Sequence, residues 1–195
     1  MLKKVIALCF FVGLVGSASL VTASSRYEID SVHSTVGFAV KHMLFSTVRG
    51  KFNDVRANLE FDTNTNTINN LQAEILVASV DTDNEDRDAH LRSNDFFDAN
   101  NHPKMTFKST AVEELSDNKY RVEGLLTIRN ISQPITLEGQ LLGSMPGRVA
   151  FQAEGQINRQ DFDVKWNKPI QQAAGMMVSD EVDLLIEVAM YVPKN

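Results

Sequence analysis

Cysteine is almost absent from this 195-residue chain, which contains a single one, Cys9. A fold without disulfides depends on its core, and a chain of this length can bury a sizeable one. Runs of basic residues are also absent, and the formal net charge is −6. This acidic balance argues against nucleic acid as a partner and against adhesion to an anionic membrane surface.

Long apolar runs are confined to the N-terminus. There Lys3 and Lys4 precede the stretch VIALCFFVGLVG, and small or aliphatic residues follow up to Ala23. A basic start, a short apolar region and small residues before a cleavage point are the parts of a secretory signal peptide. We place cleavage after Ala23, with a cut after Ser19 as the alternative. The apolar run is too short to span about 30 Å of hydrocarbon.

Removal of residues 1–23 would leave residues 24–195 as one domain without a thiol. Lys+Arg falls from 19 to 17 against 25 Asp+Glu, so the net charge becomes −8. Cys9 follows Leu8 rather than a small residue, which argues against a lipoprotein. An exported chain without cysteine suits a bacterial periplasm. No later apolar stretch is long enough to cross a bilayer, so we expect no stable membrane insertion.

The remaining sequence alternates apolar and polar residues, which is the period of half-buried strands. Examples are STVGFAVKHM, KMTFKSTAVEEL and RVAFQAEGQINR. Turn residues separate such segments, among them Gln133-Pro134 and SMPG at 144–147. LQAEILVASV is apolar on both faces, which is typical of a strand covered on both sides. Many strands with short connections predict an all-β fold, an antiparallel barrel or sandwich.

The segment RDAHLRSNDFF at 87–97 interrupts this pattern. Thr82 and Glu85 have the spacing of a capping box, and the residues that follow lack β-branches and glycine. These features predict a short helical insertion around residues 83–97, over one end or side of the barrel. Asp88 and Arg92, four residues apart, could pair on it. The segment could be a ligand clamp or a structural cap, since buried paired charges are commonly architectural.

Catalytic motifs are lacking. The four histidines lie far apart and none belongs to HExxH, GxSxG does not occur, and no cysteine remains as a nucleophile. We therefore expect no catalysis and no cofactor. The alternative is a metal-binding enzyme or stress-response factor that uses these histidines, which are His33, His42, His90 and His102.

Large and small residues alternate on the faces that we expect to point inward. The series are Met105, Phe107, Ser109, Ala111; Val122, Gly124, Leu126; Leu137, Gly139, Leu141; and Phe151, Ala153, Gly155. A barrel of about eight strands can fill with side chains or hold one small ligand. The small residues could leave a hole for a ligand, or they could fit a taper or a bend.

Polar groups near such a hole could hold a head group. His42 is in register with Phe38 and would place an imidazole in an apolar cavity, unless it lies past the end of its strand. Arg87, His90 and Arg92 could add donors if the helix covers the opening. The planar guanidinium fork suits a carboxylate or phosphate.

Five segments together resemble the YceI-like family of polyisoprenoid-binding proteins. They are IDSVHSTVGFAVKHM, VRGKFNDVRANLEFD, ASVDTDNEDRDAHLRSNDFFDANNHPKMTFKST, INRQDFDVKW and EVDLLIEV. The resemblance implies an extended antiparallel β-barrel of lipocalin type, a periplasmic location, and a long-chain isoprenoid, quinone-like or fatty ligand in a central tunnel. Asn130 and Asp163 stand where the family pattern has glycine, and both residue types tolerate the left-handed region.

We therefore interpret the chain as a periplasmic lipid-binding protein, with carrier, storage and sensing roles left open. An empty barrel that binds another protein through its acidic surface is a third hypothesis. The oligomeric state is open, and a homodimer is one option. The candidate ligand contacts are Phe38, His42, Arg87, His90, Arg92, Phe97, Phe107, Gly139, Phe151 and Trp166.

Overall fold

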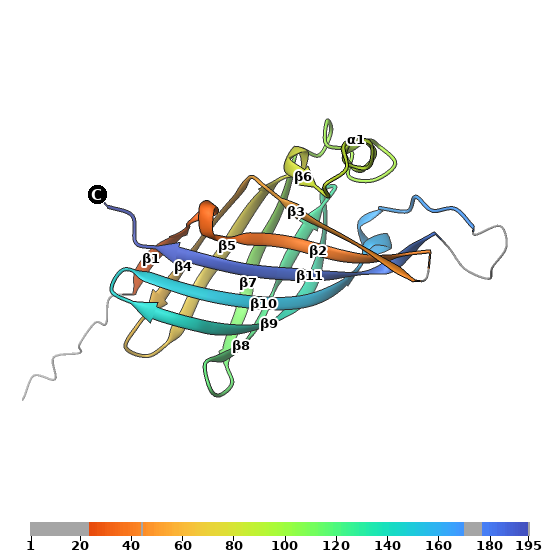
Figure 1. The fold of residues 1–195 in the computed structure, drawn as a ribbon. Helices are drawn as coiled ribbons and strands as arrows, with labels where there is room; N and C mark the ends of the chain where they lie inside the picture. The colour runs from red at the N-terminus through yellow and green to blue at the C-terminus, as the bar shows by residue number, and fades with distance from the viewer. Residues whose placement is uncertain (1–23, 44, 170–176, 195) are drawn as a thin grey trace, which may run out of the picture.

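The structure is a computed structural model that describes residues 24–43, 45–169 and 177–194. The predicted signal peptide therefore lies outside the described residues. Within them, eleven strands form one antiparallel sheet, with one short α-helix across it (Figure 1). The strands are β1 (Ser25–Ile29), β2 (Thr35–His42), β3 (Ser46–Phe52), β4 (Val55–Asp62), β5 (Thr67–Leu76), β6 (Val80–Asp81), β7 (Lys104–Glu114), β8 (Lys119–Ile128), β9 (Ile131–Met145), β10 (Arg148–Asn158) and β11 (Val178–Tyr191); the helix is α1 (Glu85–Arg92).

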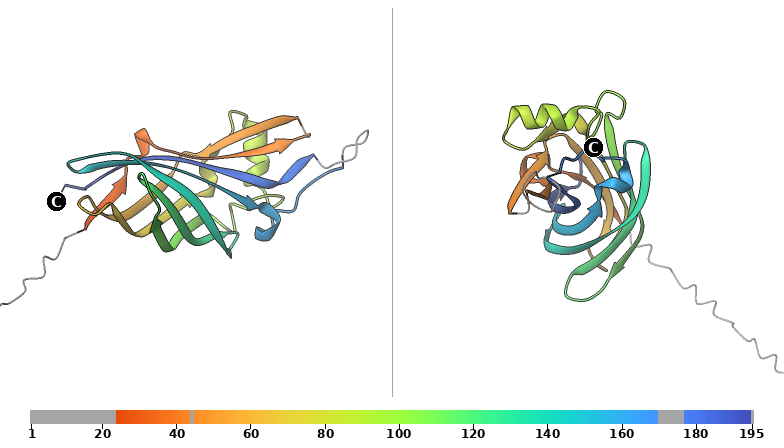
Figure 2. Two further views of the ribbon diagram at one scale, coloured as in Figure 1. Left: turned by 90° about the horizontal axis from the view of Figure 1, so that it is seen from below. Right: turned by 90° about the vertical axis from the view of Figure 1, so that its right-hand side faces the viewer.

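The eleven strands act as eight barrel staves, because three staves are interrupted. The first stave consists of β1 and β2, which both pair with β11. The second consists of β4, which pairs with β1, and β3, which pairs with β2. The third consists of β5, which pairs with β4, and β6, which pairs with β3. Each neighbouring pair is antiparallel, and the series closes from β11 back to β1 (Figure 2). The expectation of an all-β, lipocalin-like antiparallel barrel with a helical insertion is confirmed.

Ser34 joins the two halves of the first stave. The residue lies between β1 and β2, where a short 3-10 turn interrupts pairing with β11. Its hydroxyl donates to the carbonyl oxygen of Ala189 (3.2 Å) and accepts from the amide of Ala189 (3.0 Å). The Ser34 hydroxyl thus satisfies the amide of Ala189 at the break and shares its carbonyl oxygen with the amide of Asp30 (2.8 Å).

Helix α1 begins later than the capping-box spacing predicts. Asn84 is the N-cap, and its side chain accepts a hydrogen bond from the amide of Arg87 (2.9 Å). The assignment of Thr82 as the cap is wrong, because Thr82 is buried beside the helix and bonds to Asp88 instead. The helix lies across the outside of the barrel near β3 and β6 (Figures 1 and 2).

Turn residues were predicted with mixed success. Asn130 has φ 61° in the β8–β9 turn and Asp163 has φ 61°, so both adopt the left-handed conformation expected of residues that replace glycine. SMPG forms the β9–β10 turn around Gly147. Gln133-Pro134, however, is inside β9 and not a turn. Pro134 pairs with Leu125 of β8 in a part of β9 beyond its register with β10, so its missing N–H interrupts no pairing there.

Two other predictions about strands are wrong. LQAEILVASV is not one strand covered on both faces: it contains the end of β5, a 3-10 turn at Val77–Ser79 and the start of β6. Ala111 does not point inward, because the register shifts between Ser109 and Ala111 and turns Ala111 to the exposed face. A bulge of this kind reverses the alternation that follows it, which brings Val112 inward.

Candidate ligand-binding cavity

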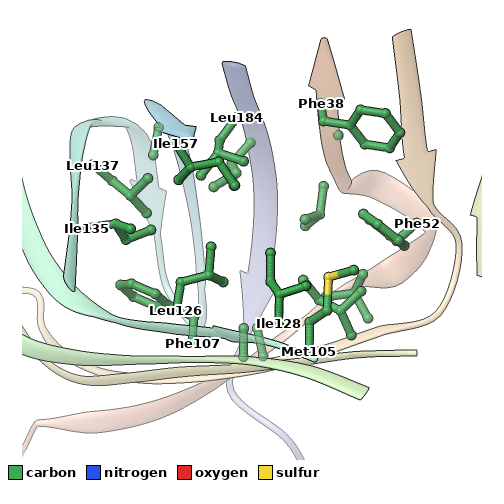
Figure 3. A pocket seen from close by; sticks show the side chains of 18 of the residues that line it. Phe38, Phe52, Met105, Phe107, Leu126, Ile128, Ile135, Leu137, Ile157 and Leu184 are labelled. Atoms are coloured by element: carbon green, nitrogen blue, oxygen red, sulfur yellow. The ribbon is translucent and has the colours of Figure 1, made fainter. Parts of the chain in front are cut away.

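An apolar cavity of about 240 Å³ runs inside the barrel (Figure 3). Its walls come from both ends of the chain, for instance Val36 and Phe38 of β2 and Leu184 and Ile186 of β11. The labelled side chains in the close-up, from Phe38 and Phe52 to Leu137 and Leu184, are hydrocarbon apart from the sulfur of Met105. Such a lining favours an aliphatic or isoprenoid chain, because every buried CH₂ contributes about 0.8 kcal/mol.

Three polar residues belong to the cavity lining, and the side chain of each is engaged by the protein, that of Gln152 on the exposed face of β10. The hydroxyl of Tyr120 donates to the carbonyl oxygen of Asn66 (2.9 Å). The amide of Gln152 donates to Gln140 (3.1 Å). Arg159 is considered separately below. The cavity therefore presents few polar groups that are ready to bind a ligand's head group.

Arg159 is a buried cation that the sequence analysis missed, although it lies in the segment INRQDFDVKW. It is 5 % exposed. Its guanidinium donates to the carbonyl oxygens of Ser179, Val164 and Trp166 and to Oδ1 of Asp180 (2.9 Å). Burial lowers the pKa of Arg159, and the carboxylate of Asp180 opposes that shift. The five-donor guanidinium thus ties the chain after β10 to the start of β11.

Aromatic rings fill the interior near the C-terminal end of β11. Phe61 contacts both Tyr27 (centroids 6.1 Å apart) and Phe151 (5.7 Å), edge to face, and Tyr120 packs on Phe151 (6.2 Å). All four rings are buried. Burial, together with the charge of Glu114, raises the pKa of Tyr120 to about 12. This cluster limits the cavity on one side.

The glycines on the inward faces of β8 and β10, Gly124 and Gly155, do not leave space for a ligand. A Cβ at Gly124 would lie 2.4 Å from Cζ of Phe107, and one at Gly155 would lie 2.6 Å from a methyl group of Leu137. Both glycines therefore accommodate a large neighbour and leave no space. Ala153 does line the cavity. Of the two explanations that the sequence left open for the small residues, space for a ligand or a fit to the barrel's shape, the second describes Gly124 and Gly155.

The ten candidate contacts fall into two groups. Four aromatic residues, Phe38, Phe97, Phe107 and Phe151, line the cavity. The other six are His42, Arg87, His90, Arg92, Gly139 and Trp166, and they are not part of its lining. Alternation along strands found Phe38, Phe107 and Phe151, whereas Phe97 lies in the turn after α1. Four further rings of the lining were missed: Phe52 on β3, Phe96 in the same turn as Phe97, Tyr120 on β8 and Phe162 in a 3-10 turn.

His42 and Gly139 lie beside the cavity wall rather than on it. His42 is the last residue of β2, next to the β2–β3 connection, where its carbonyl oxygen accepts from Ser46 (2.8 Å). The strand-end alternative describes this position. Gly139 pairs with both Tyr120 and Ala153, and a Cβ there would make ordinary contacts of 3.5–3.8 Å.

Arg87 and Asp88 both bind Thr82, at the end of the β6 stave. The Arg87 guanidinium donates to the hydroxyl (2.7 Å) and carbonyl oxygen (2.6 Å) of Thr82, and Asp88 accepts from the Thr82 amide (3.0 Å). Asp88 is 6 % exposed. These charge-assisted bonds dock the helix on the barrel, as the structural-cap hypothesis requires.

Arg92 does not form the helical pair with Asp88 that the spacing allowed. Its Nε donates to the carbonyl oxygen of Ala78 (2.9 Å) and its Nη2 to that of Val80 (2.8 Å). These two carbonyls belong to the irregular link between β5 and β6, which has fewer strand partners than a regular strand. The fork of Arg92 therefore satisfies backbone groups of the broken stave.

His90 connects the helix to two aromatic rings. It packs edge to face on Phe96 and on Trp166, with both centroids 5.0 Å away, and the two rings contact each other (5.2 Å). Its Nε2 is 2.9 Å from Oδ2 of Asp95. Since Phe96 also lines the cavity, this cluster joins the helical insertion to the cavity wall.

The other histidines occupy separate places. Nδ1 of His33 lies 3.0 Å from Asp30, and Nε2 of His102 lies 3.9 Å from Asp98. Over residues 24–43, 45–169 and 177–194, no three histidine, cysteine, aspartate or glutamate residues gather as metal ligands would.

A family model described as the YceI-like domain matches residues 27–190. The chain belongs to the YceI-like family. It is 34 % identical over 193 residues to the UPF0312 protein plu2095 of Photorhabdus laumondii, which covers 93 % of this chain and 97 % of the relative. It is 32 % identical to Protein YceI of Shigella flexneri, over 96 % of this chain and 97 % of that protein.

Several solved structures share the fold of this chain. BcnA of Burkholderia cenocepacia has a TM-score of 0.73 at 26 % identity and covers 83 % of this chain and 98 % of its own. The Campylobacter jejuni YCEI protein has a TM-score of 0.70 at 34 % identity, with coverage of 85 % and 97 %. A polyisoprenoid binding domain from Saccharophagus degradans, implicated in plant cell wall breakdown, has a TM-score of 0.67 at 15 % identity, covers 86 % of this chain and 98 % of its own, and supports the fold alone.

The family resemblance read from the five sequence segments is thus confirmed. Among the described residues, none of the helices is long and apolar enough to span a bilayer.

Proposed function

We propose that this protein is a periplasmic carrier for an amphiphilic isoprenoid-type lipid, without catalytic activity. The observation that supports this function best is the cavity itself: about 240 Å³, with apolar walls and with the side chains of its three polar lining residues engaged by protein partners. A long apolar chain enters such a space without leaving a buried polar group unsatisfied.

Phe38, Phe97, Phe107 and Phe151 contact the ligand's chain in this proposal, since they belong to the cavity wall. Arg87 and Arg92 hold the helix in place through backbone carbonyls. His90 and Trp166 support the wall through Phe96.

The test is to purify the protein from the periplasm of an expressing bacterium and to analyse it by native mass spectrometry, with solvent extraction of bound species. We expect one lipid of defined mass with an isoprenoid fragmentation pattern. A stoichiometric metal ion in place of a lipid would favour the enzyme or stress-response alternative. A protein that carries neither would favour the empty structural barrel.

Export is part of the same proposal and can be checked on the same sample. The mature protein should begin at Ser24, after removal of residues 1–23. Its melting temperature should not respond to a reductant, because the mature chain would contain no cysteine. An intact N-terminus on the purified protein would contradict both the cleavage site and the compartment.

A further inference from the structure

The barrel wall is incomplete between β9 and β10. Their register ends at the pair Glu138 and Glu154. Beyond it, β9 continues to pair with β8 as far as Ile131, and β10 continues to pair with β11 as far as Asn158. The two strands therefore each keep one neighbour while they separate from each other, and a groove of about 390 Å³ opens at this seam.

The groove and the central cavity share one layer of side chains. Ile135 of β9, Ile157 of β10 and Phe162 of the following 3-10 turn line both spaces. Figure 3 shows Ile135 and Ile157 projecting into the cavity from this side. The floor of the groove is thus apolar and one side chain thick, which is where the chain of an amphiphile could pass from one space to the other.

The rim of the groove is rich in hydrogen-bond acceptors and contains no lysine, arginine or histidine among its described lining residues. Glu123 and Asp161 contribute carboxylates. The Gln133 amide nitrogen is already used by the backbone oxygen of Asp161 (3.1 Å), and that of Gln156 by Asp183 (3.0 Å). One N–H of each amide is therefore already bonded within the protein, and the two formal charges on the rim are both negative.

We propose that this groove binds the head group of the ligand, and that the head group is an uncharged alcohol whose hydroxyl donates a hydrogen bond to the acceptor-rich rim. The lipid chain then passes between Ile135, Ile157 and Phe162 into the barrel. The inference rests on the proposed function for the chain and adds a site and a chemical class for the head group. An anionic head group is disfavoured, because it would lie beside Glu123 and Asp161.

Three probes of equal chain length separate binding of the head group from binding of the chain. They are farnesol, farnesyl phosphate and the hydrocarbon farnesene. Dissociation constants come from displacement of a fluorescent apolar probe from the full chain. Farnesol should bind about fivefold more tightly than farnesyl phosphate, the size of effect that partly exposed charges produce. Farnesene reports binding of the chain alone.

Two variants assign the head group to the groove. Glu123→Lys should tighten farnesyl phosphate about fivefold and leave farnesene unchanged. Glu187→Lys on β11, outside the groove, is the charge-matched control and should change none of the three. Thr136→Trp should fill the groove from its exposed rim and weaken farnesol while farnesene binding is kept.

The possible results separate this inference from the function on which it rests. If none of the three probes binds, both are wrong. If farnesene binds, but farnesyl phosphate equals farnesol and neither Glu123→Lys nor Thr136→Trp distinguishes them, the barrel holds the chain and the head group lies elsewhere.

Discussion

The ring of Phe107 occupies the space beside Gly124 on the neighbouring strand. A Cβ at position 124 would lie 2.4 Å from Cζ of Phe107 and 2.7 Å from the backbone oxygen of Lys108. The ring of Phe107 can therefore pack against β8 only because position 124 has no side chain. The ring in turn forms part of the cavity wall.

Gly124→Ala should destabilise the protein by about 1–3 kcal/mol, since the ring and the backbone must both move. The measurement is the free energy of unfolding in urea. Gly143→Ala is the matched control, because a Cβ there meets nothing within 4 Å. That change should be neutral or stabilise by about 0.4–1 kcal/mol through the unfolded chain. Equal effects at the two positions would contradict the close contact at Gly124.

Ala153→Phe should abolish copurification of lipid while the protein stays folded. Ala153 lines the cavity, and a ring there would occupy the volume that we assign to the ligand's chain. Gly139→Leu, on the strand beside it, should act in the same direction. Ala150→Phe, on the opposite face of β10, is the control and should retain the lipid.

The alternative for Ala153→Phe is a packed interior, in which the added ring would cost about 1–3 kcal/mol of stability. Lipid bound to the parent protein and an unchanged unfolding midpoint in the variant would together support a hollow barrel. A destabilised variant of a parent without lipid would contradict it.

Arg92→Ala should lower stability more than it weakens ligand retention. The change removes two charge-assisted bonds to the carbonyls of Ala78 and Val80, each contributing about 1.5–3 kcal/mol at most. Arg92→Lys should recover only part of the loss, because an ammonium group cannot reproduce the fork. Arg49→Ala, on the exposed face of β3, controls for loss of charge.

The paired measurement is the unfolding midpoint without ligand and the lipid retained per protein. Loss of lipid with an unchanged midpoint would instead support the clamp hypothesis for Arg92.

Ionisation of the Tyr120 phenol should lower the free energy of unfolding in alkaline solution. Its pKa is raised to about 12 by burial and by Glu114, above the ordinary value of 10.0. A raised pKa means that the folded state holds the proton more tightly. The contribution is fully present below pH 10 and is lost as the pH rises through about 12. Tyr120→Phe should flatten this part of the stability profile.

The same substitution should cost about 1 kcal/mol at neutral pH, because the hydrogen bond to Asn66 is lost. Tyr191→Phe, on β11, is the matched control for removal of a phenol. An alkaline decline that is identical in both variants would contradict the role of Tyr120.

The sequence predicted those features of the barrel that depend on single residues, such as the direction of a side chain on a strand or the conformation of a turn residue. Alternation placed Phe38, Phe107 and Phe151 inward, and Asn130 and Asp163 have the left-handed geometry expected of residues that replace glycine. Strand breaks were harder to predict. Val77 and Val80 read as part of one apolar strand, but the chain turns between them because β5 and β6 face different parts of the partner stave.

Strand periodicity indicated which apolar residues line the cavity, but it did not reveal the partners of the polar side chains. Phe38 or Phe107 needs only the period of a strand to be placed inward. The partners of Arg87 and Arg92 are backbone carbonyls whose exposure depends on the broken stave, and no spacing in the sequence reveals this. Ala111 shows the same difficulty, because one bulge reversed a correct period.

The contact of Ser34 with Ala189 joins residues 155 positions apart. In the described part of the chain, the other neighbouring staves follow one another along the sequence, so their pairing closes only short loops. Until β11 docks, the sheet is an open ribbon with two free edges and encloses no volume. The cavity therefore forms only when β11, the last strand of the chain, has paired with its neighbours. Under the proposed function, a chain truncated before Val178 would have no cavity to hold a lipid, and docking of the last strand would set the earliest moment of binding.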